Sequence, residues 1–283
     1  WVTGAVAAHG LDNVILSGGV AQNIKACKRL VELPALRRFW AGPISGDGSI
    51  GVGAAWLASR RFDPEAEIAG LPTIYLGTEP TPKAVSDAVH ANGLQGKYKL
   101  LENPTAAQAA GWIEAGHVVA RFSGRMEFGQ RALGNRSILA DPRRAESIER
   151  INQKIKYRDF WMPFTPSILE EYANELLVNP KNVCSPFMTI GYQSQPRARD
   201  LIAGALHPAD FSARPQFVQR HTNPEYWDLI EKFRKLTNIP ALMNTSLNLH
   251  GEPMNYTMED AVRTLTLSNL EFLALPSGLL IYR

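Results

Sequence analysis

Apolar positions recur at two different spacings along this chain of 283 residues. In residues 224–236, Tyr226, Trp227, Ile230 and Phe233 recur every three or four residues, which is the spacing of one face of a helix. Short apolar runs bounded by turn residues are typical of buried strands. The pattern predicts helices over residues 2–9, 24–33, 50–60, 80–91, 106–115, 145–154, 172–178, 224–236 and 258–267. It predicts strands over 13–16, 118–120, 185–192, 239–243, 272–275 and 279–282, with an extended segment at 210–218.

The pattern breaks once, over residues 62–73, where Pro64 and Pro72 interrupt any period. This break predicts a linker and therefore two domains, at residues 1–73 and 74–283. Mixed helices and strands on both sides give an α/β (α+β) fold class. Because the chain begins with Trp1 inside a predicted helix and not with Met, we expect it to be a piece of a longer protein.

The composition narrows the class of protein without choosing a function. Hydrophobic residues make up 45% and charged residues 20%, which is typical of a globular chain with a large core. A net charge of +3 fits an anionic small ligand as well as nucleic acid. Cys27 and Cys184 lie in unrelated contexts, so we expect no disulfide framework, no zinc knuckle and a reducing cytoplasm. We also expect no membrane segment, since no apolar run is long enough.

One basic stretch, from residue 118 to residue 164, carries most of the candidate chemistry. Its arginines are interleaved with Gly124, Gly129 and Gly134, which allow a ligand to approach the backbone closely. Apolar neighbours such as Phe122 and Leu133 indicate a partly buried segment. Arginine presents a planar fork of donors that matches phosphate or carboxylate, so the stretch predicts an anion pocket. A solvated basic face is the alternative, and we expect it for the last three arginines, Arg143, Arg144 and Arg150.

Two earlier loops have the form strand or turn, glycines, then helix. The first is Ser17-Gly-Gly-Val-Ala-Gln-Asn23, and such a loop predicts an anion or nucleotide at a helix start, with a tight turn as the alternative. In the second, Asp47 lies between two glycines. Its carboxylate suits a metal or a ribose hydroxyl, or it caps the following helix. Two such units in succession indicate the second half of an actin-like ATPase fold.

Two further segments add polar groups. Residues 244–253 predict a polar loop directly after a buried strand, and Lys156 and Arg158 head an aromatic, proline-bearing segment. His117, His207 and His250 are scattered, and we expect them to be surface or structural residues. No Ser-His or Cys-His nucleophilic pair is evident.

Three motifs together resemble the O-carbamoyltransferases of the nodulation-factor, cephamycin and tobramycin type. They are Gly124-Arg-Met-Glu-Phe-Gly-Gln-Arg-Ala-Leu-Gly-Asn-Arg-Ser-Ile-Leu-Ala-Asp-Pro-Arg143, Ser17-Gly-Gly-Val-Ala-Gln-Asn23 and Asn244-Thr-Ser-Leu-Asn248. The resemblance covers essentially the whole chain. It implies the C-terminal remnant of a Kae-like actin-fold (ASKHA) ATPase domain, followed by a YrdC-like domain with a mixed sheet. It also implies that an N-terminal actin-like half, with a metal-binding histidine pair, is missing here.

The resemblance implies a division of labour among the residues. Members use carbamoyl phosphate and ATP to make a carbamoyl adenylate and then pass the carbamoyl group to a hydroxyl of a small-molecule acceptor. Carried over to this sequence, the residues for carbamoyl phosphate or its adenylate are Arg131, Lys156, Arg214, Asn244 and Ser246. The nucleotide residues of the actin-like part are Gly18, Gly19 and Asn23, and Asp47 is the remaining ligand of a divalent metal, Fe or Mg.

The sequence departs from the family pattern in three places. Gln130 stands where proline is common, and Phe211-Ser212 replaces Gly-Thr. Met162 replaces an arginine that contacts phosphate in many members, so we expect weaker binding or compensation by Arg158 or Arg125.

ATP-dependent O-carbamoylation is therefore the leading hypothesis. An RNA-binding module is a second one, because a basic concave surface could meet a phosphate backbone. A nucleotide-binding fragment without activity of its own is the third.

Overall fold

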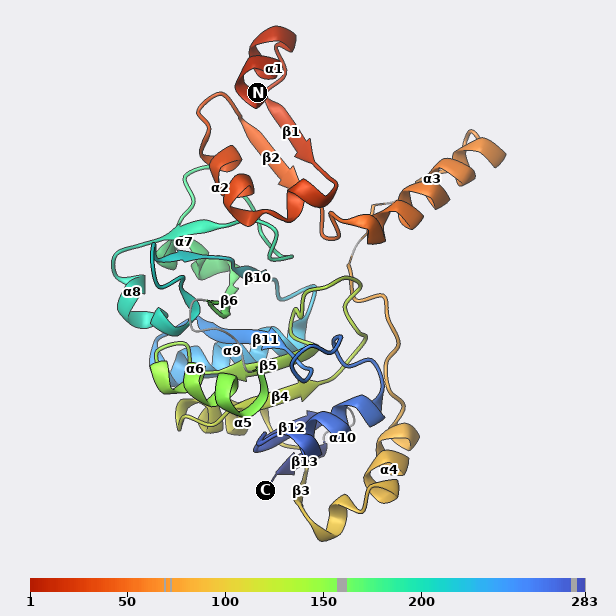
Figure 1. Ribbon diagram of the computed structural model, residues 1–283, viewed down its shortest axis with the longest axis vertical. Helices are drawn as coiled ribbons and strands as arrows, with labels where there is room; N and C mark the ends of the chain where they lie inside the picture. Colours follow the sequence, from red (N-terminus) through yellow and green to blue (C-terminus); the bar gives the residue numbers. More distant parts are fainter. Residues whose placement is uncertain (69, 72, 157–161, 276–278, 283) are drawn as a thin grey trace.

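An eight-stranded mixed sheet forms the centre of the protein (Figure 1). The computed structural model describes residues 1–68, 70–71, 73–156, 162–275 and 279–282. The strands lie in the spatial order β10 (Gln216–Val218), β6 (Thr165–Leu169), β11 (Ala241–Ser246), β5 (Arg136–Ala140), β4 (Val119–Phe122), β12 (Phe272–Leu275), β13 (Leu279–Tyr282) and β3 (Lys99–Glu102). The β10–β6 and β4–β12 pairs are parallel and the other five are antiparallel. The predicted α/β class with a mixed sheet is confirmed.

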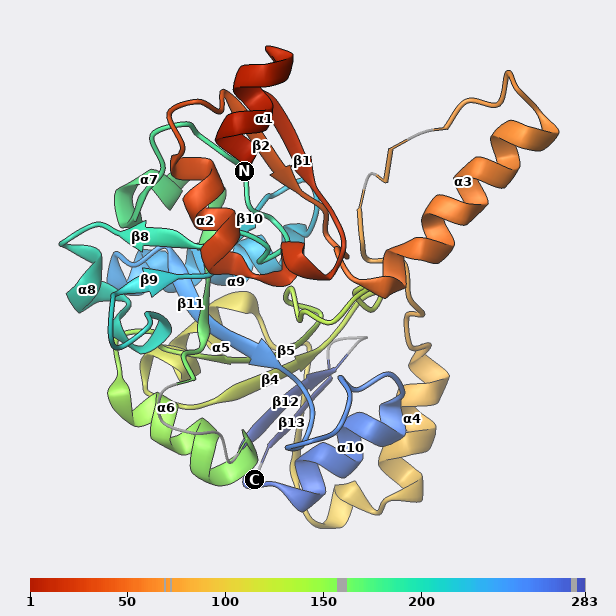
Figure 2. The same ribbon diagram turned by 45° about the horizontal axis from the view of Figure 1, so that its top comes forward.

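Helices cover both faces of this sheet, so its central strands are apolar on both sides. In β4, Val119 packs into the cluster under one face and Ala120 into the cluster under the other. The first face is covered by α5 (Ala106–Glu114) and α9 (Pro224–Thr237). The second is covered by α4 (Pro82–Ala91), α6 (Ala145–Ile151) and α10 (Met258–Leu267), and Figure 2 shows α4 and α10 side by side. The alternation explains why strand side chains of both parities are buried.

The predicted helices and late strands agree well with the structure, but three strands of the central sheet were missed. These are β3, β5 and β6, which the pattern had left in irregular segments. The cues were misleading because β5 begins with the charged Arg136 and β6 contains Pro166. The predicted strand at 185–192 is wrong: Met188 has a φ of 58°, and the strand β8 begins only at Tyr192 (Tyr192–Ser194). With β7 (Leu177–Val178) and β9 (Ser212–Ala213), it forms a small second sheet. Next to these strands lie the short helices α7 (Ala173–Leu176) and α8 (Ala198–Leu201).

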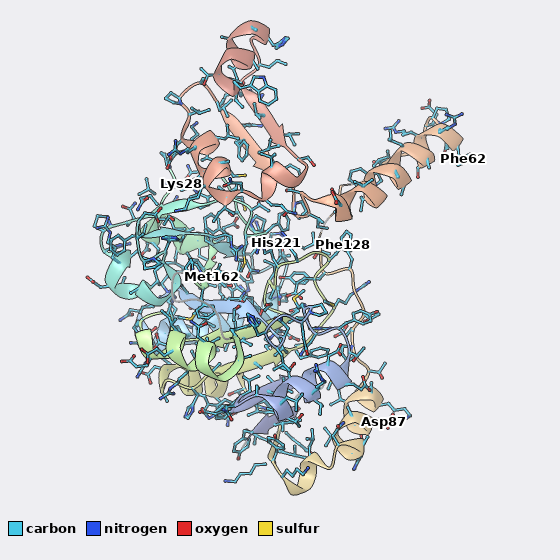
Figure 3. All side chains as sticks on the ribbon, viewed as in Figure 1. Lys28, Phe62, Asp87, Phe128, Met162 and His221 are labelled. Atoms are coloured by element: carbon cyan, nitrogen blue, oxygen red, sulfur yellow. The ribbon has the colours of Figure 1, made fainter. Side chains whose placement is uncertain are left out.

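The N-terminal part contains α1 (Val2–His9), α2 (Ile24–Glu32), α3 (Ile50–Phe62) and a parallel pair of strands, β1 (Asn13–Leu16) and β2 (Arg38–Ala41). The strand β2 was missed, because its residues were placed in a loop. Residues 13–16 form the predicted strand, but the prediction that this strand is buried is wrong. Ile15 is 72% exposed, since only one face of the pair is covered. None of the residues of helix α3 is buried, and Phe62 marks its far end (Figure 3).

The N-terminal part is attached to the rest of the molecule by apolar packing, in which Cys27 and Val31 share a buried cluster with Tyr192, and by polar contacts around α2. Lys25, in the first turn of α2, bonds the carboxylate of Asp210 and donates to Ser212 Oγ at 2.6 Å. At the other end of the helix, Lys181 Nζ donates to the main-chain oxygens of Leu33 and Leu36. The boundary at residue 73 stays a prediction. In the described part of the chain, no helix is both long and apolar enough to cross a membrane.

Candidate functional site

A small pocket opens where the end of β11, the start of β6 and the loop before β5 meet. It has about 80 Å³ of free space, enough for a small anion. Its lining comes from five separate segments: Gln130, Arg131, Ala132, Pro163, Phe164, Thr165, Met188, Arg214, Asn244, Thr245 and Ser246. Four of the five residues predicted to hold carbamoyl phosphate therefore lie around one pocket, although Arg131 and Ser246 are 115 positions apart in the sequence (246 − 131).

Lys156, the fifth predicted residue, does not line this pocket, but it contacts Ser246, which does. Its side chain is fully buried, and its Nζ lies 3.2 Å from Ser246 Oγ and 3.0 Å from the main-chain oxygen of Asn248. Nζ also donates to Asn248 Oδ1 at 2.5 Å, and Ser246 Oγ donates to the same oxygen at 2.6 Å. Sequence reasoning did not name Asn248 as a site residue, although Asn248 ends the quoted Asn244–Asn248 motif. Arg158, the suggested compensating cation, lies outside the described residues.

Asn244 is buried in the pocket wall, and its orientation is fixed by its partners. Its Nδ2 donates to the main-chain oxygen of Ala132 at 3.1 Å and to Ser167 Oγ at 3.0 Å. Since a carbonyl oxygen only accepts, the amide nitrogen must face Ala132. Asn244 Oδ1 therefore faces the other way and accepts no hydrogen bond from the described residues. Asn244 and Ser246 were predicted in a loop, which is wrong: both lie on β11, paired with β5, and the strand gives them a rigid base.

The loop that carries Arg131 is held by its main chain. Tyr75 and Gln216 donate to the oxygen of Leu133, at 2.7 and 2.8 Å. Arg121 donates to the oxygen of Gly134 at 2.8 Å. Gly134 has a φ of 115°, and a Cβ placed there would lie 2.3 Å from the ring of Tyr226. The loop is thus closely packed and needs glycine at this position.

The other described arginines of the basic stretch have structural partners. Arg136 is fully buried and donates to the oxygens of Ser123, Gly124 and Thr78, with its guanidinium 3.8 Å from the centre of the Phe122 ring. Burial lowers the pKa of Arg136 to about 10.

Further along the stretch, Arg143 and Arg144 both contact the fully buried carboxylate of Asp141. Arg150 donates to the main-chain oxygen of Gly116 at 2.6 Å. Arg144 and Arg150 are exposed, in agreement with the predicted solvated face, whereas Arg143 is half-buried; each guanidinium also bonds a group of the fold. Arg125, the other suggested compensating cation, binds the main-chain oxygens of Leu76 and Gly77, and it does not line the pocket.

The residues predicted for the actin-like part lie apart from this pocket. Gly18 and Gly19 are exposed, and a Cβ at either would meet no atom within 4 Å. Asn23 caps α2, because its Oδ1 accepts from the N–H groups of Lys25 and Ala26. The first N–H groups of this helix are therefore already bonded. The nucleotide role of these three residues stays a prediction.

Asp47 is exposed at the start of a short 3₁₀ turn, Asp47–Ser49, that leads into α3. No side chain caps that turn or α3, so the capping alternative is not observed. Within the described ranges, no group of three or more His, Cys, Asp or Glu could hold a metal ion. The described residues thus do not form the divalent metal site by themselves.

The loop of Asp47 nevertheless approaches the pocket. A Cβ placed on Gly129 would lie 3.2 Å from the side chain of Ile44, three residues before Asp47. Gly129 directly precedes Gln130 and Arg131 of the pocket lining. The two predicted sites are therefore linked through one close contact between their loops.

Residues 110–281 match the family profile described as "Carbamoyltransferase C-terminus". The match spans well over half of the chain and includes every residue of the pocket. The chain belongs to this carbamoyltransferase family. The resemblance inferred from the three motifs is thereby confirmed.

Nodulation proteins are among the similar curated proteins. The chain is 36% identical to nodulation protein NolO of Bradyrhizobium diazoefficiens, over 93% of this chain and 48% of that protein. It is 37% identical to NolNO of Sinorhizobium fredii, over 96% of this chain and 40% of that protein. Nodulation protein U of Rhizobium tropici is 30% identical to the chain, over 86% of this chain and 39% of that protein. The chain spans about half the length, or less, of these relatives.

Among solved structures, full-length HypF in its phosphate- and nucleotide-bound form aligns with 61% of this chain and 21% of its own length. The sequence identity is 14% and the TM-score 0.42, too low to carry a conclusion about this chain.

Proposed function

We propose that this carbamoyltransferase-family chain binds carbamoyl phosphate in the pocket and, with ATP, forms carbamoyl adenylate for transfer to a hydroxyl of a small-molecule acceptor. One observation carries the proposal: Arg131, Arg214, Asn244 and Ser246 surround one pocket, and Lys156 bonds Ser246. Five polar groups from distant segments thus converge on a space that suits a small anion.

The residue types fit the charge changes of this reaction. Carbamoyl phosphate, ATP and water would give carbamoyl adenylate, pyrophosphate and phosphate. Negative charge develops on phosphate oxygens, and preorganised cations stabilise such charge by several kcal/mol. Arg131 and Arg214 are half-buried, so solvent screens them less than it screens a surface pair.

The orientation of the Asn244 amide favours a carbamoyl group as the ligand in particular. Its Oδ1 lacks a hydrogen-bond donor among the described residues, and it is fixed in that orientation by Ala132. A carbamoyl group brings an N–H₂ donor, whereas an acetyl group brings none. Carbamoyl phosphate would therefore be favoured over acetyl phosphate.

Incubation of the chain with ATP and carbamoyl phosphate tests the proposal. Pyrophosphate release is expected, with little release when acetyl phosphate replaces carbamoyl phosphate. Arg131→Ala should abolish it, while Arg197→Ala should not, since Arg197 pairs with Glu175 on the surface. No release from the unmodified chain, together with unchanged phosphate binding in Arg131→Ala, would contradict the proposal.

We also propose transfer to the acceptor and a divalent metal for a protein that contains the additional length of the relatives. A cytoplasmic location is supported by the unpaired thiols of Cys27 and Cys184. The RNA-binding alternative is not favoured, because Arg121 and Arg136 of the basic stretch are buried and point into the fold.

A further inference from the structure

A buried carboxylate, Glu127, organises the loop that follows Arg131. Glu127 is 3% exposed. Its Oε1 accepts from the main-chain N–H groups of Leu133 at 2.7 Å, Asn135 at 2.8 Å and Arg136 at 3.3 Å. Three donors from one turn thus converge on a single oxygen. The role predicted for Arg131 does not account for this arrangement.

Burying this carboxylate is costly, so the arrangement requires compensation. Burial raises the pKa of Glu127, and the N–H bonds together with the charge of Arg136 act in the opposite direction. Its Oε2 accepts no hydrogen bond from the described residues. Among the described residues, the Glu127 side chain therefore accepts hydrogen bonds through Oε1 only, and all of these bonds come from the turn.

The same turn is held from its opposite side by the pocket wall. Asn244 Nδ2 binds the oxygen of Ala132, the residue between Arg131 and the turn. Glu127 binds the N–H of Leu133, the next residue along. The backbone just after Arg131 is thus clamped between a residue of the pocket and a residue that does not line it.

We infer that Glu127 is a positioning residue for Arg131: its carboxylate fixes the 133–136 turn and thereby sets where the Arg131 guanidinium enters the pocket. The inference rests on the proposed anion-binding function of the pocket. Small displacements of a binding group are sufficient to matter, since an error of about 1 Å can cost on the order of a hundredfold.

Two substitutions separate geometry from charge. Glu127→Gln keeps the length of the side chain and one acceptor oxygen but removes the charge. Glu127→Asp keeps the charge, but it is one methylene shorter and cannot reach all three N–H groups. If Glu127 acts through geometry, Glu127→Asp should weaken the binding of inorganic phosphate roughly tenfold or more, whereas Glu127→Gln should retain most of the phosphate affinity. The opposite order would overturn the inference in favour of a purely electrostatic role.

A double-mutant cycle with Arg131→Ala then tests whether Glu127 acts through Arg131. Phosphate binding is measured by calorimetry on the 283-residue chain. In the Arg131→Ala background, Glu127→Asp should have no further effect on phosphate affinity. Asp141→Asn is the matched control, because Asp141 is another buried carboxylate, bonded to Arg143 and Arg144 and not to this turn. It should lower the unfolding temperature without changing phosphate affinity.

The outcomes distinguish the two proposals. Phosphate binding that is weakened in Arg131→Ala but unchanged in Glu127→Asp overturns only the role of Glu127, as does an effect of Glu127→Asp on phosphate affinity that persists in full in the Arg131→Ala background. Failure of the unmodified chain to bind phosphate overturns the proposed function and the inference with it.

Discussion

Lys156 and Ser246 lie 90 positions apart in the chain, yet the Lys156 Nζ is 3.2 Å from the Ser246 Oγ. The contact joins the turn after α6 to the end of the strand β11. Asn248 accepts from both side chains and completes a compact triad. A buried ammonium needs such acceptors, because an unpaired buried charge is strongly destabilising.

Asn248→Ala should therefore weaken phosphate binding. Hydrogen bonds to a charged group contribute about 1.5–3 kcal/mol, so we expect a loss of roughly tenfold to a hundredfold in affinity. Asn174→Ala is the control, since Asn174 Nδ2 donates to Asn182 Oδ1 at 2.9 Å on the surface. Equal affinities of the two variants would show that Asn248 does not hold Lys156 for binding.

Arg131→Lys tests whether the planar fork matters or only the charge. Lysine keeps the positive charge but cannot bind a phosphate group in a bidentate manner. We expect kcat/KM for pyrophosphate release to fall by at least about tenfold, or about 1.4 kcal/mol of transition-state stabilisation. Arg197→Lys, at the exposed Glu175 pair, should leave the rate unchanged. Full activity of Arg131→Lys would show that a point charge is enough.

The contact between Lys25 and Asp210 should make stability depend on pH. Burial acts to raise the pKa of Asp210, but the bonds from Lys25 and Ser212 outweigh it and hold that pKa well below its usual value of 3.8. A carboxylate with a lowered folded-state pKa contributes stability above its unfolded pKa and loses it as pH falls further. Both side chains are more than a third exposed, so the contribution is below about 1 kcal/mol.

Urea unfolding between neutral pH and pH 3 measures this dependence. In Lys25→Met, the free energy of unfolding should be slightly lower near neutral pH, and it should fall less steeply below about pH 4. Lys83→Met removes a more exposed pair, with Asp87 on α4, and it should leave the steep fall in place. Identical pH profiles for Lys25→Met and the unmodified chain would contradict the assignment.

Gly134→Ala should destabilise the protein strongly. The backbone is left-handed there, and the new Cβ would overlap the ring of the fully buried Tyr226. Overpacking and strain together predict a loss of about 2–4 kcal/mol in the free energy of unfolding. Gly111→Ala, in the middle of α5 with no atom within 4 Å, should be neutral or stabilising. A small effect of Gly134→Ala in denaturant unfolding would mean that the turn can rearrange.

Much of the secondary structure was readable because periodicity reflects burial directly. The helices α9 and α10 were both predicted, and of the apolar face predicted for α9, Tyr226, Ile230 and Phe233 are buried. The strands β5 and β6 were not readable, because a charged residue and a proline mask their burial on both faces. The end of β11 was mistaken for a loop for a similar reason: Asn244 and Ser246 are polar, but a polar side chain facing a pocket can still lie on a strand.

The sequence by itself determined the family, through three specific motifs, and the residue types that suit an anion. Only the tertiary structure showed that two of the cations named from the resemblance line one pocket and that other arginines of the basic stretch do not. Arg131 and Arg214 line it, whereas Arg121 and Arg136 hold main-chain oxygens inside the fold. The physical reason is that the role of a charge depends on its partners and its burial, and both are set by segments far away in the chain. The same holds for Glu127 and Asn248: their sequence neighbours do not indicate their roles, whereas the groups that they bond in the folded protein do.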